Sequence, residues 1–415
     1  MQTYPTPSPH VAAFERLGFG MFVHWGLYAQ LGKGEWIFHQ TPDLSMDEYE
    51  KLKNTFTAAD FDADALVLAA KRAGCRYITL TTRHHEGFSL YDTCGLSDFD
   101  APHSPAGRDL VREYVDACSR HGIVPFFYHT TLDWHHPDFN DNFDRYLDYL
   151  RASVEVLCTN YGKIGGLWFD GNWSKKGADW KEDALYATIR RHQPEAMIIN
   201  NTGLGALGKL GNAELDAVTF EQGRPTPMNR AGMQKYVAAE MCQTLNDHWG
   251  IGQEDINYKS PSALIANLCA CRRVGANYLL NIGPTAQGGV EPYQADLLGL
   301  IGRWMDSYGE AIYEGRPYGA GSVGGNFLMK SADGKSLYLF ASDLGRRGSA
   351  NVVVGGKYTG AYAFGGVADR IKSIRWMDNG EELSFVQGNG MLCVNLTGFE
   401  YGKSLCVRVA KAEIE

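Results

Sequence analysis

The sequence predicts a (β/α)8 barrel in residues 1–315 and an antiparallel β-sandwich in residues 316–415, and three observations carry this prediction. The chain has 415 residues, whereas a single hydrophobic core stops growing at about 250–300 residues. Eight short apolar segments alternate with longer amphipathic segments over most of the chain. Near Gly315 this pattern gives way to short alternating segments separated by turn dipeptides. We therefore expect a large α/β domain followed by a smaller all-β domain.

The eight predicted strands are apolar along nearly their whole length, which is typical of parallel strands buried on both faces. They span residues 19–25, 77–82, 124–129, 166–170, 197–201, 217–221, 236–242 and 278–282. Helical periodicity is clearest in residues 63–73, 109–121, 143–160 and 293–305. Eight such units favour a closed barrel over an open doubly wound sheet. An open sheet would place a Gly-rich phosphate loop after its first strand, but His24-Trp25-Gly26-Leu27-Tyr28 follows instead.

The predicted sandwich rests on alternating segments such as residues 336–341 and 391–396. Three dipeptides near them are typical of tight hairpin turns: Asp333-Gly334, Asn379-Gly380 and Asn389-Gly390. Short strands joined by such turns indicate an antiparallel β-sandwich.

Charge and cysteine content exclude several classes of function. There are 39 basic and 48 acidic residues, a net charge of −9, and no run of Lys or Arg, which argues against a nucleic-acid or anionic-membrane partner. Nine cysteines without CxxC or CxH spacing indicate reduced thiols and no zinc or disulfide framework. No segment has the length of a membrane span, and Met1-Gln2-Thr3-Tyr4-Pro5 lacks signal-peptide features. We expect a soluble, cytoplasmic protein, and a homo-oligomer is compatible with the sequence.

Polar and aromatic side chains gather at the predicted carboxyl ends of successive strands, where active sites of such barrels lie. They are His24-Trp25, Arg83-His84-His85-Glu86, Tyr128-His129, Trp168-Phe169-Asp170, Asn200-Asn201 and Glu221. One such residue alone is more often a capping or solvated side chain. Their convergence at one end of one barrel predicts an active site.

Two acids, Asp170 and Glu221, stand at predicted strand ends, and their strands are two apart in the ring. Glycoside hydrolysis with retention needs a carboxylate nucleophile and a carboxylic acid about 5–5.5 Å apart. The charge of the ionised nucleophile raises the pKa of the second acid, which suits it to protonate a leaving group near neutral pH. The pair therefore indicates this chemistry.

Five motifs, in order, give the chain a recognisable pattern. They are Phe19-Gly20-Met21-Phe22-Val23-His24-Trp25-Gly26, Arg83-His84-His85-Glu86-Gly87-Phe88, Leu132-Asp133-Trp134, Trp168-Phe169-Asp170-Gly171 and Asn281-Ile282-Gly283-Pro284. Over residues 10–315 the chain resembles glycoside hydrolase family 29, the α-L-fucosidases. The resemblance implies exo-cleavage of terminal α-L-fucose with retention, on a barrel followed by a β-sandwich and without a cofactor or metal.

The resemblance also implies roles for individual residues. Asp170 matches the nucleophile, and His24, His84 and His85 match residues that line the fucose pocket. By similarity, Glu35, Trp36, Tyr128 and Trp168 are further substrate-binding candidates. Many family members carry an Arg after strand five, where this chain has Asn200-Asn201-Thr202-Gly203. Asn201 is therefore expected to supply neutral donors to the substrate, with Arg224 as another substitute.

The acid/base assignment has two candidates. Glu221 follows a strand-forming segment at the expected place, while Glu240 resembles the Glu of a separate family segment that Trp249-Gly250 completes. We favour Glu221 as the proton donor and expect Glu240 to order the site. Glu214 and Glu254 have no strand-end position and rank last.

Two other classes of function compete with the glycosidase. A metal-dependent hydrolase could use His24, His84, His85 and Asp170, but consecutive residues of a strand point to opposite faces, and the His-x-His expected of one strand is missing. A non-catalytic fucose-binding protein would lack one carboxylate, whereas both are present. The sequence therefore favours an enzyme.

Overall fold

The computed structural model describes residues 4–202, 204–322, 325–342, 344–345, 347 and 359–415. Residues 1–3, on which part of the signal-peptide prediction rests, and Gly203 lie outside this range. The chain forms two compact units, Met1–Lys259 with Asn277–Gly299 and Ser260–Ala276 with Leu300–Glu415. Among the described helices none is long and apolar enough to cross a membrane.

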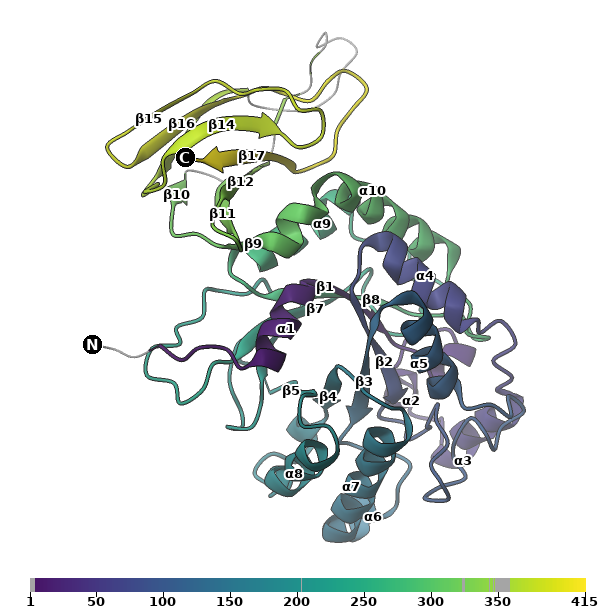
Figure 1. Cartoon of the computed structure of the whole chain (residues 1–415). Helices are drawn as coiled ribbons and strands as arrows, with labels where there is room; N and C mark the ends of the chain where they lie inside the picture. The colour runs from purple at the N-terminus through teal and green to yellow at the C-terminus, as the bar shows by residue number, and fades with distance from the viewer. Residues whose placement is uncertain (1–3, 203, 323–324, 343, 346, 348–358) are drawn as a thin grey trace. The chain divides into compact units, whose positions relative to one another are not determined.

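Eight parallel strands of the first unit close into a barrel in sequence order (Figure 1). They are β1 (Phe19–Val23), β2 (Tyr77–Arg83), β3 (Val124–Thr130), β4 (Gly166–Asp170), β5 (Met197–Asn200), β6 (Ala217–Glu221), β7 (Ala238–Thr244) and β8 (Asn277–Ile282). The ring closes between β1 and β8, where Phe19 lies opposite Tyr278. The predicted barrel is confirmed, because strands buried on both faces keep the apolar signature that the sequence shows.

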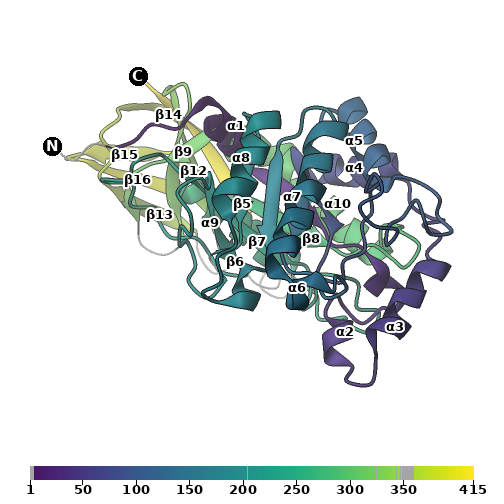
Figure 2. The same cartoon turned by 90° about the horizontal axis from the view of Figure 1, so that it is seen from below.

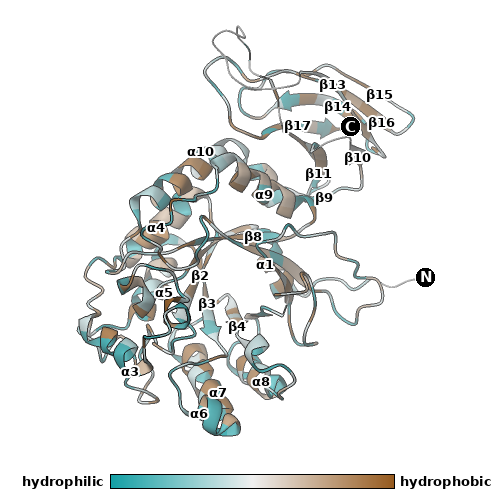
Figure 3. Cartoon of the chain, turned by 180° about the vertical axis from the view of Figure 1, so that it is seen from behind, coloured by the Kyte–Doolittle hydropathy of each residue, from teal (hydrophilic) through white to brown (hydrophobic). Residues whose placement is uncertain are grey.

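Helices lie outside the strands of this unit (Figure 1, Figure 2). They are α4 (Ala63–Ala73), α5 (Leu110–His121), α7 (Phe143–Asn160) and α8 (Glu182–His192), with the short α2 (Ile37–Gln40), α3 (Met46–Tyr49) and α6 (Asp138–Asp141) in loops. Asp62 and Asp109 cap α4 and α5 by accepting from backbone amides. In α7 the buried residues recur at helical spacing, which gives it an apolar and a hydrophilic face (Figure 3).

The alternation of strands and helices fails in one part of the ring. No helix occurs among the described residues between β5 and β6, or between β6 and β7. The helix α1 (Pro9–Leu17) contacts β5 and β7. Its Val11 and Phe14 join the apolar cluster inside the barrel, and Asn277 Nδ2 donates to Phe14 O at 2.8 Å. An N-terminal helix therefore supplies apolar cover at the amino ends of the strands.

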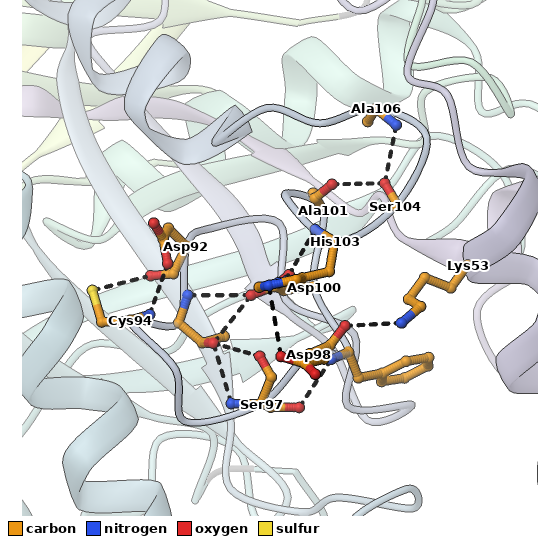
Figure 4. Close-up of polar contacts among 12 residues, drawn as sticks. Lys53, Asp92, Cys94, Ser97, Asp98, Asp100, Ala101, His103, Ser104 and Ala106 are labelled. Atoms are coloured by element: carbon orange, nitrogen blue, oxygen red, sulfur yellow. Dashed lines mark hydrogen bonds and ion pairs between the residues drawn. The ribbon is translucent and has the colours of Figure 1, made fainter.

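The long loop between β2 and α5 is ordered by its own polar side chains (Figure 4). Asp100 is fully buried and accepts from Thr93 Oγ1 at 3.0 Å and from His103 Nδ1 at 2.6 Å. The backbone of Ser89 also bonds to Phe99 and Ala101. These contacts fix the loop that begins with His84 and His85.

The second unit contains two antiparallel sheets, as predicted for a sandwich. One has the order β10-β13-β16-β15 and the other β14-β17-β12-β11-β9. The strands are β9 (Gly315–Pro317), β10 (Gly321–Ser322), β11 (Phe327–Ser331), β12 (Ser336–Ala341), β13 (Gly360–Gly365), β14 (Ile371–Trp376), β15 (Phe385–Gly388), β16 (Met391–Leu396) and β17 (Arg408–Ile414). Asn389 and Gly390, with φ of 52° and 73°, join β15 to β16 in the hairpin turn that the sequence predicts. The unit also includes α9 (Pro261–Arg273) and the C-terminal part of α10 (Pro292–Glu314).

Candidate active site

A cavity of about 180 Å³ opens at the carboxyl ends of the barrel strands. Every residue of the predicted site except Glu35 lines it. The lining residues are Phe22, His24, Trp36, His84, His85, Tyr128, Trp168, Asp170, Trp173, Asn201, Leu204, Glu221, Cys242 and Trp249. Six of them are the last residue of a strand or one of the first two residues after it, at the carboxyl ends where active sites of such barrels lie: His24, His84, His85, Asp170, Asn201 and Glu221. We call this cavity the sugar pocket, after the ligand that the family resemblance in the sequence leads us to expect.

Asp170 ends β4 and is surrounded by hydrogen-bond donors. Trp173 Nε1 donates to Asp170 Oδ1 at 2.9 Å, and Tyr128 OH donates to Oδ2 at 3.4 Å. His85 Nε2 lies 3.5 Å from the same Oδ2. Donors in this arrangement stabilise a negative charge on the carboxylate. Asp170 therefore has the surroundings that an anionic nucleophile needs.

Gly171 brings Trp173 back over Asp170. Its φ is 121°, a conformation that side chains rarely adopt, and a Cβ there would lie 2.6 Å from Leu132 N. The chain can turn at this point only with glycine, and the 3-10 helix Asn172–Lys175 follows directly. Trp173 was not among the residues predicted from the sequence, although its place directly after Asp170-Gly171 is a usable signal.

Glu221 ends β6 and has a perturbed acidity. Burial raises the pKa of Glu221 to about 7, with the nearby charge of Asp170 as the second cause. Asn201 Nδ2 donates to Glu221 Oε2 at 2.6 Å, which opposes the rise. Gln222 follows in a left-handed conformation with φ of 55°, and Gln222 N bonds to Cys242 O. Glu221 is thus a carboxyl group that exchanges its proton near neutral pH.

Asn201 links the two acids. Thr219 Oγ1 donates to Asn201 Oδ1 at 2.9 Å, so the amide presents its Nδ2 to the acids. This nitrogen lies 2.6 Å from Glu221 Oε2 and 3.5 Å from Asp170 Oδ1. The two oxygens are therefore at most about 6 Å apart, nearer the retaining spacing of about 5–5.5 Å than the inverting spacing of about 6.5–9.5 Å.

Hydrogen bonds to neighbouring side chains position two of the histidines of the pocket, His24 and His85. His24 Nδ1 lies 2.6 Å from Asn281 Oδ1, and burial lowers the pKa of His24 to about 3. His85 Nδ1 lies 2.7 Å from Thr130 Oγ1. Burial also lowers the pKa of His84 well below its ordinary value. His24 and His84 are therefore neutral rings near pH 7.

The predicted orientation of His84 and His85 relative to each other is wrong. Adjacent His84 and His85 were expected to point to opposite faces, yet both line the sugar pocket, with ring centroids 4.2 Å apart. The reason is that β2 ends at Arg83, so the alternation of side chains along a strand no longer applies to them.

Aromatic rings form the walls of the pocket. Trp36 lies 5.7 Å from Trp173 and 5.7 Å from His85, centroid to centroid. Trp249 lies 5.0 Å from His24 on the other side. Such rings offer apolar faces to the C–H groups of a sugar. Phe22, Leu204, Cys242 and Trp249 are lining residues that the predicted site did not include.

Glu35 and Glu240 both lie outside the sugar pocket. Buried Glu35 accepts from the backbone amides of Trp249 at 3.0 Å and Gly250 at 2.8 Å, so it holds the loop that carries Trp249. Glu240 is inside the barrel, where it accepts from Tyr77 OH at 2.5 Å and from Trp168 Nε1 at 2.9 Å. Burial raises the pKa of Glu240 to about 7 as well, but it has no access to the pocket. Glu214, Arg224 and Glu254 do not line the pocket either.

A second and much larger cavity, of about 1160 Å³, adjoins the sugar pocket. The two share Trp173, Asn201 and Leu204. The remaining lining residues come from the segments after β4 and β5: Asn172, Lys176 to Ala184, Thr202, Gly205, Ala206, Lys209, Gly211 and Asn212. We call it the outer cavity. Among the residues that the structure describes, no group of three or more His, Cys, Asp or Glu could hold a metal ion.

The chain is similar to known enzymes over most of its length. The family model described as alpha-L-fucosidase matches residues 5–310. The tissue alpha-L-fucosidase of Bos taurus is 27% identical over 337 residues, which cover 75% of this chain and 70% of the relative. Alpha-L-fucosidase isoenzyme 1 from Paenibacillus thiaminolyticus is 32% identical, with a TM-score of 0.83 over 98% of this chain and 99% of that chain. A covalent intermediate of a Bacteroides thetaiotaomicron alpha-L-fucosidase, trapped with 2-fluoro-fucosyl fluoride, has a TM-score of 0.84 at 22% identity, covering 100% of this chain and 98% of that chain.

Proposed function

The chain belongs to the α-L-fucosidase family of glycoside hydrolases, and on that premise we propose that Asp170 and Glu221 together hydrolyse a terminal α-L-fucoside with retention of configuration. The observation that carries this assignment is the position of Asn201 Nδ2 between the two acids, 2.6 Å from one and 3.5 Å from the other. It limits the separation of the acids to a distance that suits direct attack by one of them.

In the first step Asp170 attacks the anomeric carbon, and the bond from that carbon to the leaving oxygen breaks. Glu221 gives its proton to that oxygen, so the leaving group departs as an alcohol. In the second step Glu221 takes a proton from water, the water oxygen attacks the same carbon, and the ester bond to Asp170 breaks. Fucose and the free carboxylate of Asp170 result, and two inversions give net retention.

The change of role by Glu221 follows from its electrostatics. Its pKa of about 7 depends in part on the negative charge of Asp170. That charge disappears when Asp170 becomes an ester, so the pKa of Glu221 falls and the group becomes a base. One carboxyl group thus serves as acid before the intermediate forms and as base after it.

Each of the two cavities suits a different part of a fucosylated substrate. The sugar pocket, about 180 Å³ and walled by rings and neutral histidines, suits one deoxy sugar with few polar groups. The outer cavity borders Asn201, next to the proton donor, and its volume of about 1160 Å³ suits the rest of an oligosaccharide. We infer fucosylated oligosaccharides or glycans as substrates. A cytoplasmic location stays a prediction, which the nine free cysteines support.

Trapping of the intermediate tests the assignment. A 2-fluoro-fucosyl fluoride should leave a 2-fluorofucosyl group attached to Asp170. The 2-fluorine slows both steps because it destabilises their oxocarbenium-like transition states, and the fluoride leaving group speeds only the first step, so the intermediate accumulates. Mass spectrometry of the digested protein should find the added mass on the peptide that contains Asp170. An adduct on a peptide with Glu221 or another carboxylate would overturn the assignment.

A further inference from the structure

Behind His84 lies a group of buried polar atoms that the proposed mechanism does not use. They are Tyr28 OH, His84 Nδ1 and both carboxyl oxygens of Glu86, and none makes a hydrogen bond of ordinary geometry within the part of the chain that the structure describes. Glu86 is 1% exposed and Tyr28 is fully buried. Buried polar groups without partners are costly, so this arrangement needs an explanation.

These atoms face one another at short range. Glu86 Oε2 lies 3.5 Å from His84 Nδ1, and the ring of Tyr28 lies 5.4 Å from the ring of His84. Gly26 closes the space, because a Cβ there would lie 2.4 Å from Glu86 Oε1 and 2.8 Å from the Tyr28 ring. His84 itself lines the sugar pocket, with Nδ1 turned away from it toward Glu86. Its other nitrogen, Nε2, is therefore the one that meets the sugar.

The state of Glu86 decides which nitrogen of His84 carries the proton. A neutral imidazole has one N–H, and the partner of one nitrogen fixes the role of the other. An ionised Glu86 would attract the proton to Nδ1 and leave Nε2 as an acceptor. A neutral Glu86 would donate to Nδ1 and leave Nε2–H as a donor toward the sugar. Hydrogen bonds of this kind are often long in an empty site and shorten when ligand binds.

The surroundings of Glu86 favour its neutral form. The groups that face it are the phenols of Tyr28, Tyr49 and Tyr128, the acids Glu35 and Asp133, and His84. Burial raises the pKa of Glu86 to about 8, although the backbone amides of Glu86 and Leu27 oppose the rise. Repulsion from the two acids adds to the effect of burial.

We propose that Glu86 is a positioning residue, a neutral carboxylic acid whose O–H donates to His84 Nδ1 and which thereby makes His84 Nε2–H a hydrogen-bond donor to the sugar. This inference rests on the proposed function, because it requires that the sugar pocket bind fucose. His24 has the opposite arrangement. Asn281 Nδ2 donates to Trp249 O at 2.7 Å, so Asn281 Oδ1 accepts from His24 Nδ1–H, and His24 Nε2 is an acceptor.

The two rings, with centroids 5.6 Å apart, then present one donor and one acceptor. A single sugar hydroxyl can accept from His84 and donate to His24, so its hydrogen-bond direction is fixed before it binds. Ionisation of Glu86 would give the hydroxyl two acceptors and no donor at these positions. Binding of fucose should therefore weaken as the pH rises through about 8.

Calorimetric titration with L-fucose between pH 6 and pH 10 tests this. Glu221→Gln serves as the parent, because it removes the titration of the acid. We expect its Kd for fucose to rise about tenfold across this range, as the loss of one hydrogen bond in a buried site predicts. Adding Glu86→Gln should keep the Kd at pH 7 within a few-fold and abolish the rise, since the amide still donates to Nδ1 but cannot ionise. Adding Glu86→Leu should raise the Kd about tenfold at every pH.

The outcomes separate the two proposals. If the Glu221→Gln parent fails to bind fucose at pH 7, the proposed function is wrong. If the parent binds but the rise persists with Glu86→Gln, or the Kd with Glu86→Leu equals that of the parent, the role of Glu86 is wrong. Long-range ¹⁵N–¹H spectra of the histidine rings, assigned with His84→Asn, give a direct measurement. They should show His84 protonated at Nε2 at pH 7, and a proton on Nδ1 would overturn the inference.

Discussion

Replacing Asn201 by Ala should move the pH profile of the enzyme upward. Asn201 Nδ2 donates to Glu221 Oε2 at 2.6 Å and so favours the ionised form of that carboxyl, whose pKa is about 7. A hydrogen bond to a charged group contributes about 1.5–3 kcal/mol, and about 1.4 kcal/mol corresponds to a tenfold change in acidity. Water that enters the vacated space replaces part of this contribution. The pKa of Glu221 should therefore rise by about one pH unit.

The sign of the change follows from the role of Glu221. As the proton donor it must be protonated, so kcat/KM is high below its pKa and falls above it. The assay is kcat/KM for an unactivated fucoside between pH 5 and pH 10, which reports on the free enzyme. The alkaline limb should lie near pH 7 in the wild type and near pH 8 in Asn201→Ala. Thr219→Val, which removes only the bond that orients Asn201, should shift the limb in the same direction by less.

An alkaline limb that stays in place, or moves to lower pH, would refute this reasoning. In that case either Glu221 is not the group that gives the limb, or Asn201 does not bond to it in solution. Only the position of the alkaline limb decides the test. The height of the profile does not, because Asn201 also lines the sugar pocket and its loss can lower kcat/KM at every pH.

Three further predictions follow from the site. Glu221→Ala should lose far more glycosylation rate on a natural oligosaccharide than on an activated aryl fucoside, and azide should restore turnover with a fucosyl azide of retained configuration. Glu240→Ala, which removes the acceptor of Tyr77 and Trp168, should lower the rates on both substrates by similar factors, and the reverse pattern would exchange the roles of the two acids. Trp173→Phe removes the indole donor to Asp170 and should lower kcat/KM about 10–100-fold with little change in Tm, whereas unchanged kinetics would show that this bond does not support the nucleophile. Dialysis against EDTA should leave activity unchanged, and a loss that zinc restores would favour the metal-dependent hydrolase.

The barrel and most of the sugar pocket could be predicted because the ends of the buried strands can be recognised in the sequence. Buried parallel strands leave continuous apolar segments, and Asp170 and Glu221 are the last residues of β4 and β6. The family resemblance predicted both His84 and His85 in the pocket, but strand alternation alone would have placed them on opposite faces, because their actual orientation depends on β2 ending at Arg83. Trp173 reaches the site through the turn at Gly171 and Trp249 through a loop that Glu35 holds. Such loop positions depend on tertiary contacts that local sequence patterns do not encode.

Side chains from α1 and the strands fill the interior of the barrel, and this affects the order in which the leaving alcohol departs and water enters. Val11 and Phe14 close the amino ends of the strands, and the ring of Tyr77 contacts Phe14. Tyr77 OH bonds to Glu240, which in turn accepts from Trp168 in the lining of the sugar pocket. Within the part of the chain that the structure describes, side chains therefore fill the barrel on the side of the strands' amino ends, and the sugar pocket adjoins the outer cavity at Trp173, Asn201 and Leu204. On the proposed mechanism we expect the leaving alcohol to withdraw toward the outer cavity before water reaches the esterified Asp170, and a second alcohol in that cavity should compete with water for the same carbon. The ratio of transfer to hydrolysis should rise with the concentration of such an acceptor.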